Sequence, residues 1–233
     1  MSLYERAVNV LARIYARGIR SGAVLDSDTY FPGARDFQSN WRDWRAESDQ
    51  IVQNLERVPR FHEVMPSQAD ISANDNRDWR MFILQAYGVP VPGNLARCPK
   101  LAAMIAAHPE VLSATLSFLA SGKHIPEHHG PFRGIVRYYL VLRVPLTQAG
   151  EPGAILRIDG IDHRVGEGGD LLWDNTFRHE VWNQTEEVRV ALLLDVRRAH
   201  LPAPLRVLTK ALVAAIATGF RWRLATGRDI TIG

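Results

Sequence analysis

Apolar and polar residues alternate through the second half of the chain, over residues 110–197. In the segment VLSATLSFLA, every second residue from Leu112 to Phe118 is apolar, and the residues between them are Ser or Thr. Such a period of two is typical of a β-strand with one buried face. A second alternating segment, IVRYYLVLRVP, places a mixed set on one face: Arg137, Tyr139, Val141 and Arg143. We expect both segments to be strands.

Turn signals and short apolar segments follow these two strands. The pair Asp159-Gly160 lies between apolar residues in ILRIDGIDHRV and predicts a two-residue hairpin turn. Three further segments predict short strands, at residues 171–174, 179–183 and 188–196. Closely spaced strands with turn signals predict a mainly β fold, either a sandwich or a barrel.

Helical periodicity replaces the alternation outside this region. Apolar residues at three- and four-residue steps predict helices over residues 3–20, 36–55 and 99–107, and one strand is expected over 79–87. The first helix carries a basic stripe made of Arg6, Arg13, Arg17 and Arg20. A last helix is predicted from Pro204, with an apolar side made of Leu205, Leu208, Leu212, Ala215 and Ile216.

These elements predict a β core with a helical buttress in one domain, residues 1–233. Its parts are a basic amphipathic helix in 1–25, the β core in 110–197 and the terminal helix in 204–224. A chain of 233 residues with 46% hydrophobic content is long enough to bury such a core. The single cysteine, Cys98, cannot form an internal disulfide and is expected to be a buried hydrophobe.

The two terminal helices leave two interpretations open. Each is either a surface helix packed on the domain or a basic helix lying on an anionic membrane surface. The apolar stretch of the last helix, residues 211–220, is too short to span a bilayer and is flanked by Arg and Lys. No secretory signal is expected at the N-terminus, so we expect a cytoplasmic protein, with contact to the inner membrane face as the alternative.

The charge pattern indicates which classes of molecule the protein binds. The formal net charge is +3, and no basic stripe interleaved with aromatic residues is present. We therefore expect no nucleic-acid partner. A small molecule, a peptide or a lipid remains as the substrate class.

Candidate chemistry gathers between residues 117 and 189. Two histidines, His128 and His179, lie 51 residues apart, each at the edge of a strand-like segment. Neutral imidazole is a good ligand for iron, copper, nickel or zinc. The usual non-haem iron site adds a carboxylate two residues after the first histidine, and that position is Gly130 here.

A cationic residue in an apolar strand adds to this pattern. Arg189 lies in the strand-like segment VRVALLLDV, where it shares a face with Ala191 and Leu193. A guanidinium in such surroundings needs a carboxylate, because its burial is otherwise costly. That carboxylate belongs either to a bound ligand or to the protein, with three candidates: Glu186, Glu187 and Asp195. The residues alone leave both options open.

Two longer segments carry a family resemblance. HHGPFRGIVRYYLVLRVP, followed by WDNTFRHEVWNQTEEVRVALLLDV, resembles the aspartyl/asparaginyl β-hydroxylase family of Fe(II)/2-oxoglutarate dioxygenases. That family includes bacterial lipid A hydroxylases and some free-amino-acid hydroxylases. The resemblance is specific over residues 110–197 and weaker over 31–51 and 78–88.

The resemblance implies both a fold and a site. The fold would be a double-stranded β-helix (jelly roll, cupin-like) with N-terminal helices and a C-terminal amphipathic helix. Iron would be held by His128 and His179, with no other catalytic residue beyond the metal centre and with O2 as co-substrate. Arg189 would bind the distal carboxylate of 2-oxoglutarate. Further co-substrate contacts would come from Ser117, Arg137 and Tyr139, where Tyr139 replaces a histidine of the animal aspartyl hydroxylases.

The family that this sequence resembles contains branches that act on different substrates. Gly130 agrees with the aspartyl branch and its two-histidine iron site, whereas the lipid A hydroxylases keep an Asp there. We therefore expect hydroxylation of an aspartyl- or asparaginyl-type side chain. Hydroxylation of a lipid acyl chain at a membrane surface is the alternative, because of the basic terminal helices. A third possibility is a non-catalytic β-barrel that binds a carboxylate.

Overall fold

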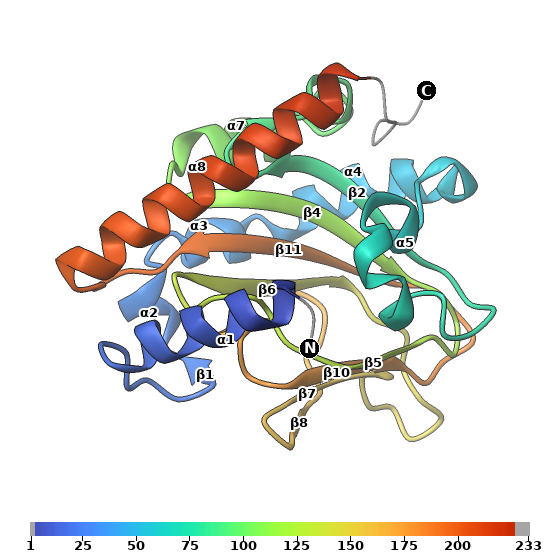
Figure 1. Cartoon of the computed structure of the whole chain (residues 1–233). Helices are drawn as coiled ribbons and strands as arrows, with labels where there is room; N and C mark the ends of the chain where they lie inside the picture. Colours follow the sequence, from blue (N-terminus) through green and yellow to red (C-terminus); the bar gives the residue numbers. More distant parts are fainter. Residues whose placement is uncertain (1–2, 227–233) are drawn as a thin grey trace.

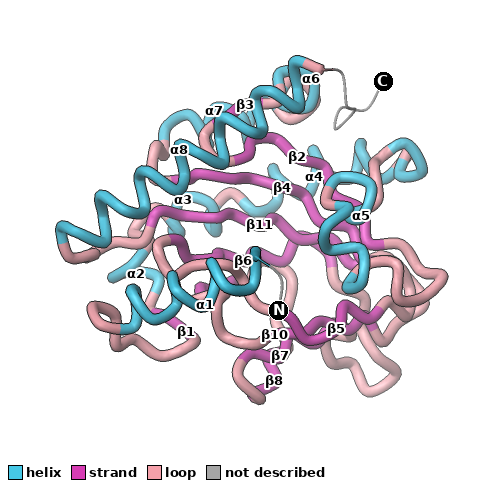
Figure 2. Tube along the Cα trace, in the orientation of Figure 1, coloured by secondary structure: helices cyan, strands magenta, loops and turns pink. Residues whose placement is uncertain are grey.

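The protein folds as two facing antiparallel sheets with helices on the outside (Figures 1 and 2). The computed structural model describes residues 3–226, with the side chains of residue 8 and of residues 10–226. The strands are β1 (Val24–Leu25), β2 (Trp79–Ala86), β3 (Val89–Pro90), β4 (Val111–Leu119), β5 (His124–His128), β6 (Ile135–Arg143), β7 (Ala154–Ile158), β8 (Ile161–His163), β9 (Asp170–Trp173), β10 (His179–Asn183) and β11 (Arg189–Arg197).

The α-helices are α1 (Leu3–Ala16), α2 (Ser27–Tyr30), α3 (Ala34–Ser39), α4 (Trp41–Val52), α5 (Phe61–Val64), α6 (Pro92–Leu95), α7 (Pro99–Ala107) and α8 (Ala203–Ala225). Two short 3-10 helices follow α4 and α5: η1 (Leu55–Arg57) and η2 (Pro66–Ile71). The predicted β core therefore has helices before it and one long helix after it.

Strand order identifies the fold. The larger sheet has the order β1-β9-β6-β11-β4-β2-β3, and the smaller sheet has the order β5-β10-β7-β8. From β4 onward the chain alternates between them: β4, β6, β9 and β11 lie in the larger sheet, and β5, β7, β8 and β10 in the smaller one. This is a double-stranded β-helix of the jelly-roll, cupin-like type, as predicted. The hairpin turn is confirmed as well, because Asp159 and Gly160 both have positive φ, 50° and 81°.

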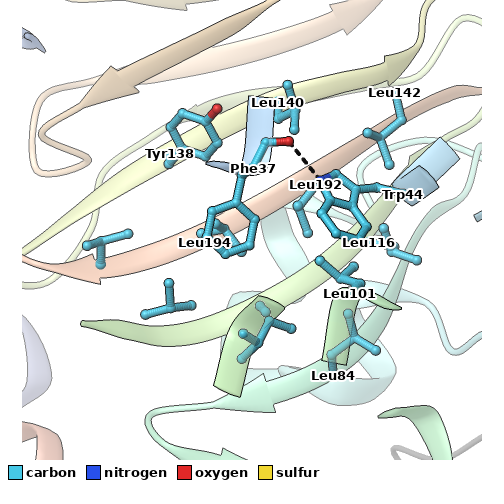
Figure 3. Close-up of a cluster of buried hydrophobic side chains, with 14 of the residues drawn as sticks. Phe37, Trp44, Leu84, Leu101, Leu116, Tyr138, Leu140, Leu142, Leu192 and Leu194 are labelled. Carbon is cyan, nitrogen blue, oxygen red and sulfur yellow. Dashed lines mark hydrogen bonds between the residues drawn. The ribbon is translucent and has the colours of Figure 1, made fainter. Parts of the chain in front are cut away.

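The main core lies between the larger sheet and the helices behind it (Figure 3). Alternate residues of the sheet point to this side and meet α3, α4 and α7. The central members are Phe37, Trp44, Leu101, Leu116, Tyr138, Leu140, Leu192 and Leu194. The other face of the same strands is turned toward the smaller sheet, where Tyr139, Val141 and Ala191 form a second cluster. The central strands are thus covered on both faces, which makes them a rigid support.

One predicted helix is in fact two. The helix expected over residues 36–55 is broken at Asn40, which has φ −103° and ψ 17° and separates α3 from α4. The Asn40 side-chain amide donates to the carbonyl of Asp36 at 2.8 Å. Asn side chains compete with the helix for backbone groups in this way, and the periodicity of the apolar residues does not reveal it. The buried face was predicted well, since Phe37, Trp44 and Ile51 are buried.

Strand β5 was missed by the sequence prediction. Its sequence, HIPEH, contains Pro126, which argues against a central strand. The strand lies at the edge of the smaller sheet, where β10 is its one neighbour among the described strands. An edge strand tolerates proline, because one row of its backbone groups has no neighbour to pair with.

The larger sheet extends beyond the smaller one, and α1, α5 and α8 cover the remainder of that face (Figure 1). The N-terminal part of α8 packs with α1, and Tyr15 Oη and Thr209 Oγ1 lie 2.7 Å apart. The C-terminal part of α8 packs on the edge of the sheet through Phe220 and Leu224. The helix is 23 residues long, and by length and composition alone it is apolar enough to cross a membrane, in contrast to the short apolar stretch considered above.

Candidate active site

The two histidines predicted as metal ligands are neighbours across the smaller sheet. Strands β5 and β10 pair so that His128 is directly opposite His179, and the ring centroids are 4.2 Å apart. The Nδ1 atom of His128 lies 2.8 Å from the carbonyl oxygen of Pro126, and that of His179 lies 2.9 Å from the carbonyl oxygen of Phe177. Donation from Nδ1–H to a carbonyl fixes the tautomer in which Nε2 is free to bind a metal.

Burial keeps both rings neutral. Desolvation lowers the pKa of His128 to about 4. Desolvation, followed by the proximity of His128, lowers the pKa of His179 to about 3. A metal binds the neutral ring, so the pair needs no deprotonation near neutral pH.

Arg189 is a buried cation without a carboxylate partner among the described residues. It is 2% exposed, and its Nη1 donates a long hydrogen bond of 3.5 Å to Ser117 Oγ, whereas its Nε has no partner. The ring centroid of Tyr139 is 5.7 Å from its guanidinium carbon. Desolvation lowers the pKa of Arg189 and raises that of the Tyr139 phenol. A buried guanidinium of this kind favours an anionic ligand.

The protein carboxylates considered from sequence do not serve Arg189. Asp195 is bound by Arg137 instead, through contacts of 2.8 Å from Nε and 3.1 Å from Nη2. The two residues are directly opposite each other on β6 and β11. Glu186 accepts from the Ser121 hydroxyl at 3.3 Å. Of the two options left open above, the structure thus favours a carboxylate from a ligand.

All six residues predicted for the site line one small cavity of about 40 Å³ between the sheets. They are His128, His179, Arg189, Ser117, Arg137 and Tyr139. Two tryptophans that the sequence reasoning did not single out close the cavity: Trp79, whose Nε1 donates to Ser117 Oγ at 3.0 Å, and Trp173, which meets the His179 ring edge-on at 5.9 Å. The structure shows this assembly, while the role of each residue stays a prediction.

Gly130 is closed off by a side chain that the sequence reasoning also missed. A Cβ atom at Gly130 would lie 2.6 Å from Oδ1 of Asn175, and the Gly130 amide donates to the Asn175 carbonyl at 2.6 Å. Asn175 is 3% exposed and its Oδ1 has no partner. No group of three or more His, Cys, Asp or Glu that could hold a metal occurs in residues 3–226. The donor set near the histidines is therefore two imidazoles.

A buried ion cluster fixes the turn that leads to His179. The Asp174 carboxylate is completely buried and accepts from Arg133 Nε at 2.7 Å and from Arg198 Nη1 at 2.8 Å. It also accepts from the Thr176 hydroxyl at 2.6 Å. These partners come from distant segments, so sequence spacing gives no signal for the cluster. Its effect is to hold the loop that supplies the Phe177 carbonyl to His179.

A second, larger cavity of about 620 Å³ is also lined by the two histidines. His128, His179, Trp79 and Arg137 line both cavities. The remaining wall is mostly apolar and comes from the larger sheet, α5, η2, α1 and α8. The histidine pair thus lies where a small cavity that contains Arg189 meets a much larger one.

The fold and this geometry define a cupin-like protein in which two neutral imidazoles face a buried arginine. A sequence model described as Aspartyl/Asparaginyl beta-hydroxylase matches residues 38–199, and the chain belongs to that family. It is therefore a hydroxylase of the 2-oxoglutarate dioxygenase type, and the non-catalytic alternative is wrong. Family membership implies dependence on Fe(II) and 2-oxoglutarate. The two neutral imidazoles and the unpaired Arg189 fit that pair of groups.

Several known proteins are similar to this chain. Ornithine lipid ester-linked acyl 2-hydroxylase of Rhizobium tropici is 34% identical over 201 residues, which cover 84% of this chain and 68% of that protein. Human aspartate beta-hydroxylase domain-containing protein 2 is 26% identical over 60% of this chain, and human aspartyl/asparaginyl beta-hydroxylase is 26% identical over 57%. The matches span 38% and 17% of the lengths of these two human proteins. Among solved structures, a predicted oxalate decarboxylase from Thermotoga maritima matches with a TM-score of 0.31 and 18% identity, covering 40% of this chain and 72% of that one.

Proposed function

We propose that this hydroxylase acts on the acyl chain of an amphipathic lipid, which enters the larger cavity and reaches the histidine pair. The observation that carries the proposal is the apolar wall of this cavity. Its volume of about 620 Å³ lies within the range of about 300–1,000 Å³ that ligand sites occupy. The relative from Rhizobium tropici, named for hydroxylation of a lipid acyl group, supports the same substrate class.

The wall of the cavity is suited to an alkyl chain. Its apolar residues come from α1, α5, η2, β2 and α8. They include Leu11, Phe61, Val64, Ile71, Met81, Ile83, Leu212, Ile216 and Phe220. Of its Arg and Asp residues, Arg137 and Asp195 neutralise each other, and Arg223 reaches the Glu63 carbonyl at 3.4 Å. An amino acid or a peptide would leave several amide or charged groups against this apolar surface, which costs free energy. Methylene groups would instead gain by leaving water.

The residues divide the chemistry between the two cavities. His128 and His179 would hold Fe(II) through Nε2, and Arg189 with Ser117 and Tyr139 would hold the distal carboxylate of 2-oxoglutarate. When bound, iron and 2-oxoglutarate supply the activation of O2 and the hydroxylation of a C–H bond. The neutral Tyr139 phenol and the indole of Trp173 help to exclude water from this side.

An aspartyl or asparaginyl side chain is the second candidate substrate. Gly130, with its position closed by Asn175, agrees with the two-histidine branch of the family. This observation concerns the metal site, however, and not the cavity that receives the substrate. The apolar wall and the relative from Rhizobium tropici therefore favour the lipid.

The test compares substrate classes directly. The purified protein with Fe(II) and 2-oxoglutarate is incubated with acylated amino-acid lipids, peptides or free amino acids. Succinate release and a product heavier by one oxygen atom are followed by mass spectrometry. We expect hydroxylated product only from the lipid. A hydroxylated peptide or amino acid, with unchanged lipid, would overturn the proposal.

A cavity-filling variant sharpens the test. Gly219 of α8 lines the large cavity, and a Cβ added there meets nothing within 4 Å. Gly219→Leu therefore adds bulk at the cavity, starting from a Cβ position that is open, and we expect lost turnover of long acyl chains and retained turnover of short ones. Gly93→Leu is the matched control, because Gly93 is also helical, also open, and outside the cavity. Equal chain-length profiles in the two variants would contradict an acyl chain in this cavity.

A further inference from the structure

Helix α8 lies across the front of the molecule and is held at both ends (Figure 1). Near its start, Thr209 is tied to Tyr15 of α1. Near its end, Phe220 and Leu224 pack on the sheet edge, and Arg223 reaches the Glu63 carbonyl of α5. Between these ends, Leu212, Ile216 and Gly219 line the large cavity. The helix is therefore anchored along the protein while its far side faces outward.

One exposed stripe of α8 carries no charge, although Arg206, Lys210 and Arg221 are exposed on the same helix. Residues spaced by three and four positions form one stripe along the helix, made of Val207, Ala211, Ala215, Thr218 and Trp222. All five are exposed, Val207 by 67% and Trp222 by 62%. The outer face of a helix in a water-soluble protein is normally charged or polar. An uncharged outer stripe of this length points to an apolar neighbour.

Cations lie beside the stripe. Lys210 and Arg221 of α8 and Arg197 of β11 line a separate cavity of about 460 Å³ between α8, α7 and the sheet. None of these three side chains has an ion-pair or hydrogen-bond partner in the described part of the chain. Helix α8 contains neither Asp nor Glu. This arrangement is complementary to phosphate groups lying at the level of the helix.

The neighbouring helix α1 adds to the same surface. It lies on the same side of the larger sheet as α8 (Figures 1 and 2). Val10 and Ile14 are exposed there by 54% and 37%, next to the exposed Arg13 and Arg17. Apolar side chains flanked by cations thus occur on both helices that border the large cavity.

We propose that α8, with α1 beside it, lies in the interfacial plane of an anionic lipid bilayer. The uncharged stripe is buried at the boundary of head groups and acyl chains, and Lys210, Arg221 and Arg197 contact lipid phosphates. The helix lies along the membrane and does not cross it, because both of its ends are packed on the catalytic fold. The proposal goes beyond the proposed function, since it concerns docking and holds whichever substrate the cavity takes. The predicted cytoplasmic location agrees with it, because the cytoplasmic leaflet is anionic.

Vesicle binding by the full-length protein tests the charge requirement. The protein is sedimented with phosphatidylcholine vesicles alone or with added phosphatidylglycerol. We expect binding to the anionic vesicles and little to the neutral ones, with loss at high salt because the phosphate contacts are screened. Lys210→Glu/Arg221→Glu should weaken binding to anionic vesicles by more than about tenfold. Equal binding of this variant, or no binding to any vesicle, would overturn the proposal.

A pair of matched substitutions tests the apolar stripe. Val207→Glu should lower vesicle affinity about tenfold, because a side chain of this size loses its burial. Ile161→Glu is the control, because Ile161 is equally exposed, by 63%, on the distant β7–β8 hairpin. Both are surface changes and leave the circular dichroism and melting temperature close to those of the parent protein. Equal loss in the two variants contradicts the assignment of the stripe.

Site-specific labelling reports which face touches the lipid. Cys98 is completely buried, and burial raises the pKa of its thiol to about 12, so it does not compete for a thiol-reactive dye. A polarity-sensitive dye at Val207→Cys should shift to shorter wavelength on anionic vesicles, and one at Ile161→Cys should not. The reverse pattern overturns the proposal. Turnover of lipid dispersed in detergent separates the two proposals: if Val207→Glu retains it, docking is lost and the proposed function stands.

Discussion

At the scale of single residues, the site depends on a cation that is buried without a counter-charge from residues 3–226. Arg189 lies between the sheets, and the nearby Asp195 is already bound by Arg137. Leaving a buried guanidinium uncompensated costs several kcal/mol. Arg189 therefore lowers the free energy of unfolding of the protein when metal and ligand are absent. Stability and ligand binding are therefore opposed at this one position.

This opposition gives the first prediction. Arg189→Met should weaken 2-oxoglutarate binding by about 100-fold or more, because charge-assisted hydrogen bonds contribute roughly 1.5–3 kcal/mol each. Its free energy of unfolding should be unchanged or higher, since a buried charge is removed. Calorimetric titration with 2-oxoglutarate and urea unfolding measure the two effects. Arg35→Met, at a guanidinium with 74% exposure, is the control, and undiminished affinity in Arg189→Met would rule out the assigned role.

The histidine pair predicts how stability depends on pH. Both folded-state pKa values lie below the ordinary histidine value, at about 4 for His128 and about 3 for His179. The unfolded chain therefore binds more protons than the folded one between pH 6.5 and these values. Stability of the metal-free protein should be complete above that range and decline as the pH falls through it. Each histidine adds a slope of up to about 1.4 kcal/mol per pH unit.

Urea unfolding of the chelated protein at pH 7, 6 and 5 checks this slope. In His179→Gln the free energy of unfolding should fall less steeply between pH 6 and 5. The difference in slope from the parent protein is the contribution of one histidine, up to about 1.4 kcal/mol per pH unit. Other groups titrate in both proteins, so the difference isolates His179. Parallel curves would show that His179 is not buried as a neutral ring.

At the scale of elements, the loop between β9 and β10 positions the histidine pair through buried contacts. Asp174 anchors the loop, Asn175 fills the space beside Gly130, and the Phe177 carbonyl orients His179. We expect these three residues to take no direct part in the reaction. They act by position, which is why a periodicity search does not find them.

Gly130 and Asn175 should behave as a coupled pair. Gly130→Ala brings a Cβ to 2.6 Å from Asn175 Oδ1 and should destabilise the protein by about 1–3 kcal/mol. Asn175→Gly removes the clashing side chain, so the double variant should recover most of that loss. A double-mutant cycle from thermal or urea unfolding measures the coupling. Additive effects would mean that the two side-chain positions do not share the same space.

Asp174→Asn should reach the metal site from a distance. It removes the charge that compensates Arg133 and Arg198, and losing one partner of a buried pair costs about 3–5 kcal/mol. Iron affinity should fall as well, because the loop that orients His179 loosens. Asp162→Asn is the control, since its ion pair with Arg157 is exposed and contributes little. If the Asp174→Asn variant is destabilised but binds iron with normal affinity, Asp174 stabilises the fold and does not position His179.

At the scale of the whole molecule, the sequence predicts the scaffold better than the contacts that complete the site. Alternation identified β4 and β6, and the resemblance supplied the double-stranded β-helix and a set of six site residues, all of which line the small cavity. The long-range partners could not be predicted, because Asp195 with Arg137 and Asn175 with Gly130 become neighbours only in the folded chain. Gly130 also pointed toward an amino-acid substrate, whereas the apolar cavity, built from α1, α5, α8 and the sheet, favours a lipid.

The shared wall between the two cavities has a kinetic consequence. His128, His179, Trp79 and Arg137 line both, so a molecule that reaches Arg189 through the large cavity must pass the place that an acyl chain later fills. The co-substrate should therefore bind first, in a compulsory order. An unreactive alkyl analogue, competitive with the lipid, should then be uncompetitive with 2-oxoglutarate in steady-state kinetics. Noncompetitive (mixed) inhibition of 2-oxoglutarate by the analogue would instead mean that either molecule can enter first, and that the small cavity fills and empties independently.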